Sequence, residues 1–159
     1  MRKHVSSQGQ TIIEVVIALA VGILLLTGIT VAVTTSLNNA HYSKEQNQAS
    51  QLAQEGIDAM RSIRDSSYTT FIGYSPSTQY CLNDGQTVPE ISCSQIDQTF
   101  TRTVAFSDND PSCAIDATTY RKVTVAVTWS DGRCSDGALC HNVTLASCFS
   151  DYLVVPTPQ

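Results

Sequence analysis

The sequence predicts an α+β protein: a long N-terminal helix, membrane-spanning in its first half, packs its second half on a small antiparallel β-sheet head. Residues 12–33 form an almost uninterrupted apolar run, and residues 35–65 continue at helical spacing without a proline. Three later segments alternate apolar and polar residues as strands do. The chain has 159 residues, which is enough for one modest domain and an anchor.

Charge and composition narrow the classes of function. The chain carries 9 Lys and Arg against 14 Asp and Glu, for a net charge of −5. An acidic chain without a basic patch repels phosphate backbones, so we expect no nucleic-acid partner. No Ser, Cys or His stands in a recognisable nucleophile context and no phosphate-binding glycine loop occurs. We therefore expect neither an enzyme nor a cofactor.

The apolar run is long enough to be a membrane span. At 1.5 Å of rise per residue, residues 12–33 can cross a hydrocarbon core about 30 Å thick. Arg2 and Lys3 precede the run, which predicts a cytoplasmic N-terminus and an extracytoplasmic head. A cleaved secretory signal is the alternative. Its apolar core is typically ~7–15 residues long, however, and Thr-Thr-Ser at 34–36 is a poor cleavage site.

Glu14 is the one charged residue within this run. A carboxylate inside a bilayer costs about 3 kcal/mol even on lenient insertion scales, so it needs either a partner or a function. The plain alternative is an acid close enough to the membrane surface to snorkel or to be protonated.

Residues 9–14, GQTIIE, with the apolar helix behind them, resemble the prepilin motif of type IV pilins and type II secretion pseudopilins. In that family a membrane peptidase and N-methyltransferase cuts after the glycine, and the glutamate is the fifth mature residue. The resemblance implies cleavage between Gly9 and Gln10, with Gln10 as the modified N-terminus. The family most often has Phe at this position, and an N-terminal Gln can cyclise, so methylation and cyclisation both stay open.

The resemblance also supplies a partner for Glu14. When subunits pack helix against helix, its carboxylate can pair with the α-amino group of the neighbour's Gln10, which sets the axial register. The implied partners are the prepilin peptidase, other pilin or pseudopilin subunits, an inner-membrane assembly platform and membrane lipid. The implied location is the bacterial inner membrane, with the head outside, and a periplasmic or surface filament after assembly.

The second half of the helix carries an apolar stripe that we expect to face the core. Its members are Ala49, Leu52, Ala53, Gly56, Ile57, Met60 and Ile63. Residues 52–68 and 120–132 are similar to segments of minor pilins and I-type pseudopilins.

The predicted divisions are a leader at 1–9, a membrane or filament-core helix at 10–34, an amphipathic helix at 35–65 and a disulfide-containing head at 66–159.

In the head, residues 66–98 are polar and turn-rich and read as a long connecting loop. Strands are expected at 99–106, 121–129 and 142–149. Their apolar faces comprise Phe100, Val104 and Phe106, then Val123, Val125, Val127 and Trp129, then Val143, Leu145 and Phe149. Three strands cannot bury these faces alone, and the helix stripe supplies the cover.

All six cysteines fall in the second half of the chain, which is typical of a disulfide framework made in an oxidising compartment. Six cysteines allow fifteen pairings. We favour Cys81–Cys93, Cys113–Cys148 and Cys134–Cys140. Free thiols or metal ligands are the alternatives, but the Cys134, Cys140 and His141 set lacks a second ligand pair for zinc.

Asp108 and Asp110 have the alternate spacing of a calcium loop, and some pseudopilins bind calcium near the end of the sheet. The glycine and distal glutamate of a complete site are missing, so we favour a turn and expect no metal.

The function expected from the whole sequence is a minor pilin or pseudopilin. The alternative is a single-pass anchored extracytoplasmic binding protein that does not polymerise.

Overall fold

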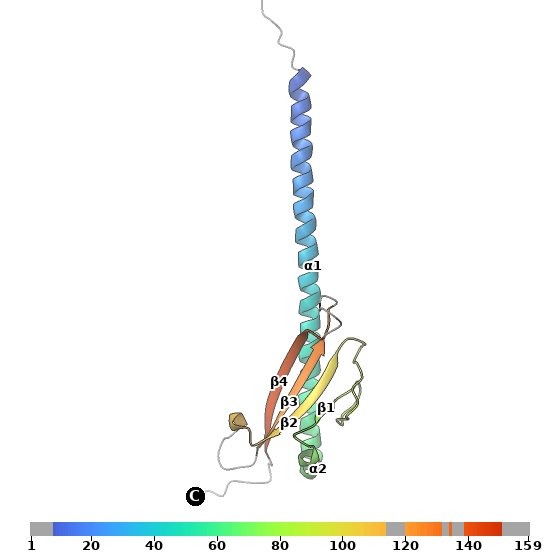
Figure 1. The fold of residues 1–159 in the computed structure, drawn as a ribbon, viewed down its shortest axis with the longest axis vertical. Helices are drawn as coiled ribbons and strands as arrows, with labels where there is room; N and C mark the ends of the chain where they lie inside the picture. Colours follow the sequence, from blue (N-terminus) through green and yellow to red (C-terminus); the bar gives the residue numbers. More distant parts are fainter. Residues whose placement is uncertain (1–7, 114–119, 132–133, 135–138, 151–159) are drawn as a thin grey trace, which may run out of the picture. The chain divides into compact units, whose positions relative to one another are not determined.

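A computed structural model describes residues 8–113, 120–131, 134 and 139–150 (Figure 1). Contacts divide the chain into two units, Met1–Ser43 and Lys44–Gln159, and the boundary lies within one helix. The helices are α1 (Gln8–Ser66), α2 (Tyr68–Gly73) and the 3-10 turn η1 (Pro111–Cys113). The strands are β1 (Gln79–Cys81), β2 (Thr101–Asp108), β3 (Tyr120–Trp129) and β4 (His141–Ser150). This arrangement confirms the predicted α+β class.

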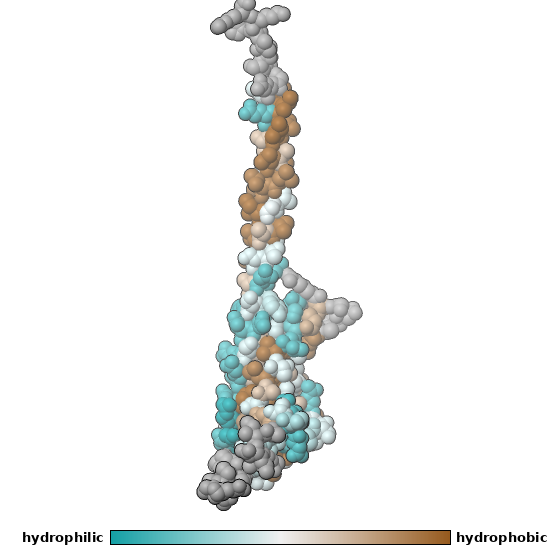
Figure 2. Space-filling view, turned by 90° about the vertical axis from the view of Figure 1, so that its left-hand side faces the viewer, coloured by the Kyte–Doolittle hydropathy of each residue, from teal (hydrophilic) through white to brown (hydrophobic). Residues whose placement is uncertain are grey.

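The first unit contains the N-terminal part of α1, and much of the surface of its described residues is apolar (Figure 2). Side chains from Thr11 to Ser43 are exposed, with Gly22 alone half-buried. The helix is long and apolar enough to cross a membrane, and its most apolar window has no residue buried in the protein. This length and composition suit a single membrane crossing.

The second unit is built on the C-terminal part of α1. Leu52 is half-buried and the other six residues of the predicted apolar stripe are buried, with Ala49, Ala53 and Met60 fully inaccessible. The sequence here is rich in Ala, Gln and Glu and has no proline, which favours a continuous helix. The predicted core face of the helix is therefore confirmed.

The sheet is antiparallel throughout, and its strands follow the order β1-β2-β3-β4. In register, Val104 of β2 lies opposite Val125 of β3, which lies opposite Leu145 of β4. The apolar faces predicted for residues 99–106 and 121–129 are buried. On β4, Phe149 is buried, whereas Val143 and Leu145 are half-buried because no strand in the described part of the chain lies beyond β4.

The interpretation of residues 66–98 as a connecting loop was incomplete, because this stretch contains α2 and β1. Helix α2 has six residues and depends on a cap, in which the Ser67 hydroxyl accepts a hydrogen bond from the Thr70 N–H, and on Phe71, which is fully buried. Strand β1 has three residues, too few to show alternation. Both elements are set by tertiary packing rather than by a local pattern.

Candidate functional site

The residues of the predicted cleavage and assembly motif lie in the first turns of α1. Gly9 and Gln10 are helical, and Glu14 follows about one turn later on the exposed surface. Its neighbours Ile13 and Val15 are 64% and 58% exposed. Within the described residues Glu14 forms no ion pair, so among them its carboxylate is a charged group on an apolar surface without an ionic partner.

The three threonines at 27, 30 and 34 of this helix are satisfied internally. The hydroxyls of Thr27, Thr30 and Thr34 donate to main-chain carbonyls one turn earlier, at Ile23, Leu26 and Thr30. A hydroxyl bonded in this way enters an apolar environment at little cost. Among the polar side chains of residues 12–34, Glu14 is therefore the one for which the described residues supply no partner.

The structure joins the six cysteines in the three favoured pairs. Cys81–Cys93 has a Cα–Cα distance of 5.1 Å, Cys113–Cys148 of 5.6 Å and Cys134–Cys140 of 5.7 Å. These distances lie within the usual range for disulfides. The pairs fasten the β1–β2 connection, the η1 turn to β4, and the β3–β4 connection.

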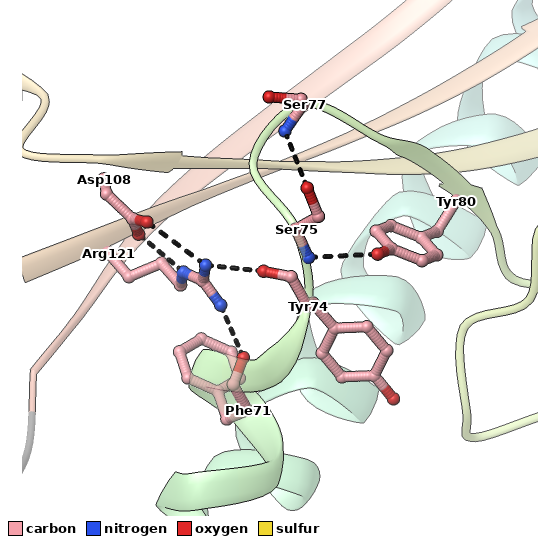
Figure 3. Close-up of polar contacts among 7 residues, drawn as sticks. All are labelled: Phe71, Tyr74, Ser75, Ser77, Tyr80, Asp108 and Arg121. Carbon is pink, nitrogen blue, oxygen red and sulfur yellow. Dashed lines mark hydrogen bonds and ion pairs between the residues drawn. The ribbon is translucent and has the colours of Figure 1, made fainter.

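The first calcium candidate, Asp108, is held by a protein cation (Figure 3). Arg121 of β3 donates from Nε to Asp108 Oδ1 at 2.6 Å and from Nη2 to Oδ2 at 3.2 Å. The same guanidinium donates to the carbonyl oxygens of Phe71 and Tyr74, both at 2.6 Å. Its planar face also lies over the ring of Phe106. Asp108 thus belongs to a structural network that fixes α2 against the sheet.

The second candidate, Asp110, is likewise occupied by protein groups. It accepts hydrogen bonds from the hydroxyl and N–H of Ser112, and from Lys122 Nζ at 3.2 Å. These bonds, Ser112 foremost, lower the pKa of Asp110 from 3.8 to about 2. The arrangement is an Asx-type turn with an ion pair, in line with the turn favoured from the sequence.

Two buried arginines are structural residues that the sequence analysis missed. Arg102 is 5% exposed and donates to the carbonyls of Leu52 and Leu82, at 2.9 and 3.0 Å. Burial lowers the pKa of Arg102, which Glu55 at 3.5 Å partly offsets. Arg121 is 3% exposed. The sequence did contain a signal for them. Both arginines fall at positions whose side chains point to the core in the alternating inward and outward pattern of their strands.

Four potential metal ligands gather at the β3–β4 connection. Ligand atoms of Asp131, Cys134, Cys140 and His141 all lie within 4.8 Å of one another. Asp131 Oδ2 lies 3.1 Å from His141 Nε2, which makes an ion pair when the imidazole is protonated. The two sulfurs are bonded to each other, however, and a disulfide offers no thiolate to a metal. The cluster is therefore a cross-linked turn rather than a metal centre.

Comparison with protein-family models, with curated proteins and with solved structures found no match to this chain.

Proposed function

We propose that the chain is a minor pilin or pseudopilin, a structural subunit of a type IV pilus or a type II secretion-like filament. In this proposal a separate prepilin peptidase cleaves the chain after Gly9, and the subunits assemble through the N-terminal helix and Glu14. The observation that carries this proposal is the carboxylate of Glu14, which forms no ion pair within the described residues and lies in the exposed, largely apolar run of residues 12–33. In the assembled filament, Glu14 binds the α-amino group of a neighbouring Gln10.

Assembly would satisfy two charged groups that are costly when each is alone in the membrane. A carboxylate and an ammonium group are each unfavourable alone in an apolar environment, but together they form one hydrogen-bonded pair. Cleavage after Gly9 would create the amine at Gln10, four residues before Glu14. At 1.5 Å per residue, that offset is about 6 Å along the helix axis, which is the axial stagger the pair would impose between neighbouring subunits.

The head supports a role outside the cytoplasm. Three disulfides in a small domain are typical of an oxidising compartment. The orientation required is the one that Arg2 and Lys3 predict, with the leader retained in the cytoplasm. Peptidase cleavage then takes place on the side of the membrane opposite the head.

The test begins with the intact mass and N-terminal peptide of the protein from its native membrane. Loss of residues 1–9 supports processing, and the mass on Gln10 distinguishes a methylated amine from a cyclised one. An uncleaved N-terminus would leave Glu14 without its amine partner and would favour the anchored binding protein that does not polymerise.

A second experiment tests assembly itself. Glu14→Ala should leave the head folded and abolish incorporation into filaments. The matched control is the double variant Glu14→Val with Val15→Glu, which keeps the composition and moves the carboxylate about 100° around the helix. We expect this variant to fail as well, because the pairing depends on position. Normal filament entry by either variant would contradict the pairing.

A further inference from the structure

Four residues with metal-ligating side chains meet where β3 ends and β4 begins. We call them the hairpin cluster: Asp131, Cys134, Cys140 and His141. Carboxylate oxygen, imidazole nitrogen and thiolate sulfur are the ligands that Zn²⁺ binds in proteins. With its two sulfurs bonded to each other, the cluster is a cross-linked turn, so its chemistry depends on its oxidation state.

The pairing of β3 with β4 identifies the fourth ligand. The sequence places Asp131 and Asp136 near Cys134, Cys140 and His141 and does not distinguish between the two acids. Among the described residues, Asp131 is the acid beside the other three: its Oδ2 lies 3.1 Å from His141 Nε2 and its Oδ1 lies 3.9 Å from Cys134 Sγ. Four protein ligands make a closed zinc site, the kind that stabilises a fold and leaves no position for a substrate.

The distances within the hairpin cluster suit a tetrahedral ion. Zn²⁺ binds oxygen and nitrogen at about 2.0 Å and sulfur at about 2.3 Å, so neighbouring ligand atoms stand about 3.3–3.8 Å apart around it. The 3.1 Å between Asp131 and His141 is already close to that separation. All four ligand atoms lie within 4.8 Å of one another, and opening of the disulfide lets the two sulfurs move apart to the distance that the ion requires.

The imidazole of His141 is held in a fixed orientation. His141 pairs with Trp129 at the end of the β3–β4 ladder (Figure 1), and the centroids of the two rings lie 5.4 Å apart. Trp129 is 1% exposed, and its indole N–H donates to Glu45 Oε2 at 3.1 Å. A ligand that its surroundings already orient loses little conformational freedom when the metal binds.

Of the three disulfides, Cys134–Cys140 is the most open to a reductant. Each of the other two has one deeply buried cysteine, Cys81 or Cys113, whereas Cys134 is half-buried and Cys140 is exposed. Cys134–Cys140 also closes the shortest loop, with a sequence separation of 6 against 12 and 35. Its opening therefore removes the least chain-entropy stabilisation from the fold.

We propose that the hairpin cluster is a redox-controlled zinc site, which binds one Zn²⁺ ion when a dithiol reductant opens the Cys134–Cys140 disulfide. The dithiol transfers two electrons and two protons, so the disulfide becomes two thiols and the dithiol becomes a disulfide. Zn²⁺ then displaces the proton of each thiol, and both sulfurs bind it as thiolates. The metal thus replaces the disulfide as the cross-link of the β3–β4 connection. The proposal is independent of the filament function, because all four ligands lie in the head.

The experiment uses the purified full chain in detergent, with Co²⁺ as a spectroscopic probe and Zn²⁺ as its competitor. After reduction and anaerobic removal of the reductant, we expect one Co²⁺ per chain, with a thiolate charge-transfer band and tetrahedral d–d bands that Zn²⁺ abolishes. The oxidised chain should show neither band. Equal binding by the oxidised chain, or binding to the reduced chain without the thiolate band, would overturn the proposal.

A double variant controls for reduction of the other two disulfides. Cys134→Ser with Cys140→Ser keeps those two pairs and removes both thiolates of the hairpin cluster. After the same reduction, this variant should lose the thiolate band. A band of parental intensity would mean that another cysteine pair binds the metal, which would overturn the assignment.

Two single variants test the remaining ligands. Asp131→Asn and His141→Gln should each weaken Zn²⁺ binding to the reduced chain by more than about tenfold, since even residues that only hydrogen-bond to a metal ligand contribute that much. Asp136→Asn makes the same acid-to-amide change within the same connection and should leave the affinity unchanged. Unchanged affinity in Asp131→Asn, or a loss in Asp136→Asn instead, would overturn the four-ligand site.

Thermal stability gives a readout that does not depend on the Co²⁺ spectrum. Zn²⁺ should raise the melting temperature of the reduced parent chain, because a ligand stabilises the folded state that binds it. The melting temperatures of the oxidised chain and of the double serine variant should not change. Fluorescence of Trp129, the chain's one tryptophan, follows the same transition beside His141. An equal rise in the parent and in the double serine variant would contradict a zinc site at this connection.

Discussion

Gly56 of α1 lies so close to Val125 of β3 that a Cβ atom at position 56 would stand 2.8 Å from Val125 Cγ1. The same atom would lie 3.3 Å from Cδ of Arg102, the buried arginine that bonds the helix. The glycine therefore sets how closely helix and sheet approach in the head.

Gly56→Ala should destabilise the head by about 1–3 kcal/mol, because the added methyl overpacks the contact with the fully buried Val125. Thermal unfolding of the full chain in detergent measures the effect. Gly73→Ala is the control, since a Cβ there meets nothing within 4 Å. Equal melting temperatures for the two variants would contradict this account of the helix–sheet contact.

Arg121→Met should lower the free energy of unfolding by about 3 kcal/mol. The substitution keeps much of the apolar volume but removes the donors to the Phe71 and Tyr74 carbonyls. Denaturant unfolding with near-UV detection, which reports the aromatic residues around α2, is the measurement. Arg61→Met is the control, because its exposed pair with Asp58 contributes about 0.5 kcal/mol or less. A similar loss in both variants would argue against the special role of Arg121.

The disulfides should rank by the loop that each closes. Cys113–Cys148 spans 35 residues and Cys134–Cys140 spans 6. Chain entropy assigns them about 4 and about 2 kcal/mol respectively. Double alanine variants of each pair, melted under non-reducing conditions, should reproduce this order. The reverse order would show that the short disulfide contributes mainly through the packing of its turn.

The Asp110 turn predicts a stability change confined to acid. The folded-state pKa of about 2 lies below the ordinary value of 3.8, so the carboxylate stabilises the fold above about pH 4. That contribution is lost as the pH falls through about 2. The melting-temperature difference between the parent and Asp110→Asn should be largest above pH 4 and should shrink towards pH 2. A difference that stays constant over this interval would contradict the assignment.

Patterns with a fixed period were predictable from the sequence. The helix stripe through Ala53 and Met60, and the alternation through Val123 and Val127, required no knowledge of the partner surface. Burial of such faces is the main driving force of folding, so periodicity marks the core directly. Two of the three favoured cysteine pairs, Cys81–Cys93 and Cys134–Cys140, were predictable for a different reason, because each joins cysteines that are close in the sequence.

Features that depend on contacts between distant segments were not predictable. Arg102 and Arg121 have the phase of core residues but the character of surface residues, and their carbonyl partners lie about 20 to 50 positions away. The sequence of residues 71–74 does not indicate that the carbonyls of Phe71 and Tyr74 accept hydrogen bonds from a distant arginine. The gathering of Asp131 and His141 at the β3–β4 connection likewise depends on the pairing of β3 with β4.

The strand order has a consequence for how the head folds. Every pairing in the sheet joins strands that are consecutive in the sequence, so the sheet can form by successive addition of neighbouring strands. Docking of Met60 and Ala53 onto the sheet joins segments far apart in the chain and is the slower, non-local step. We expect Val125→Ala to slow refolding and Met60→Ala chiefly to accelerate unfolding, which stopped-flow kinetics would measure. The reverse assignment would mean that the helix docks before the sheet is complete.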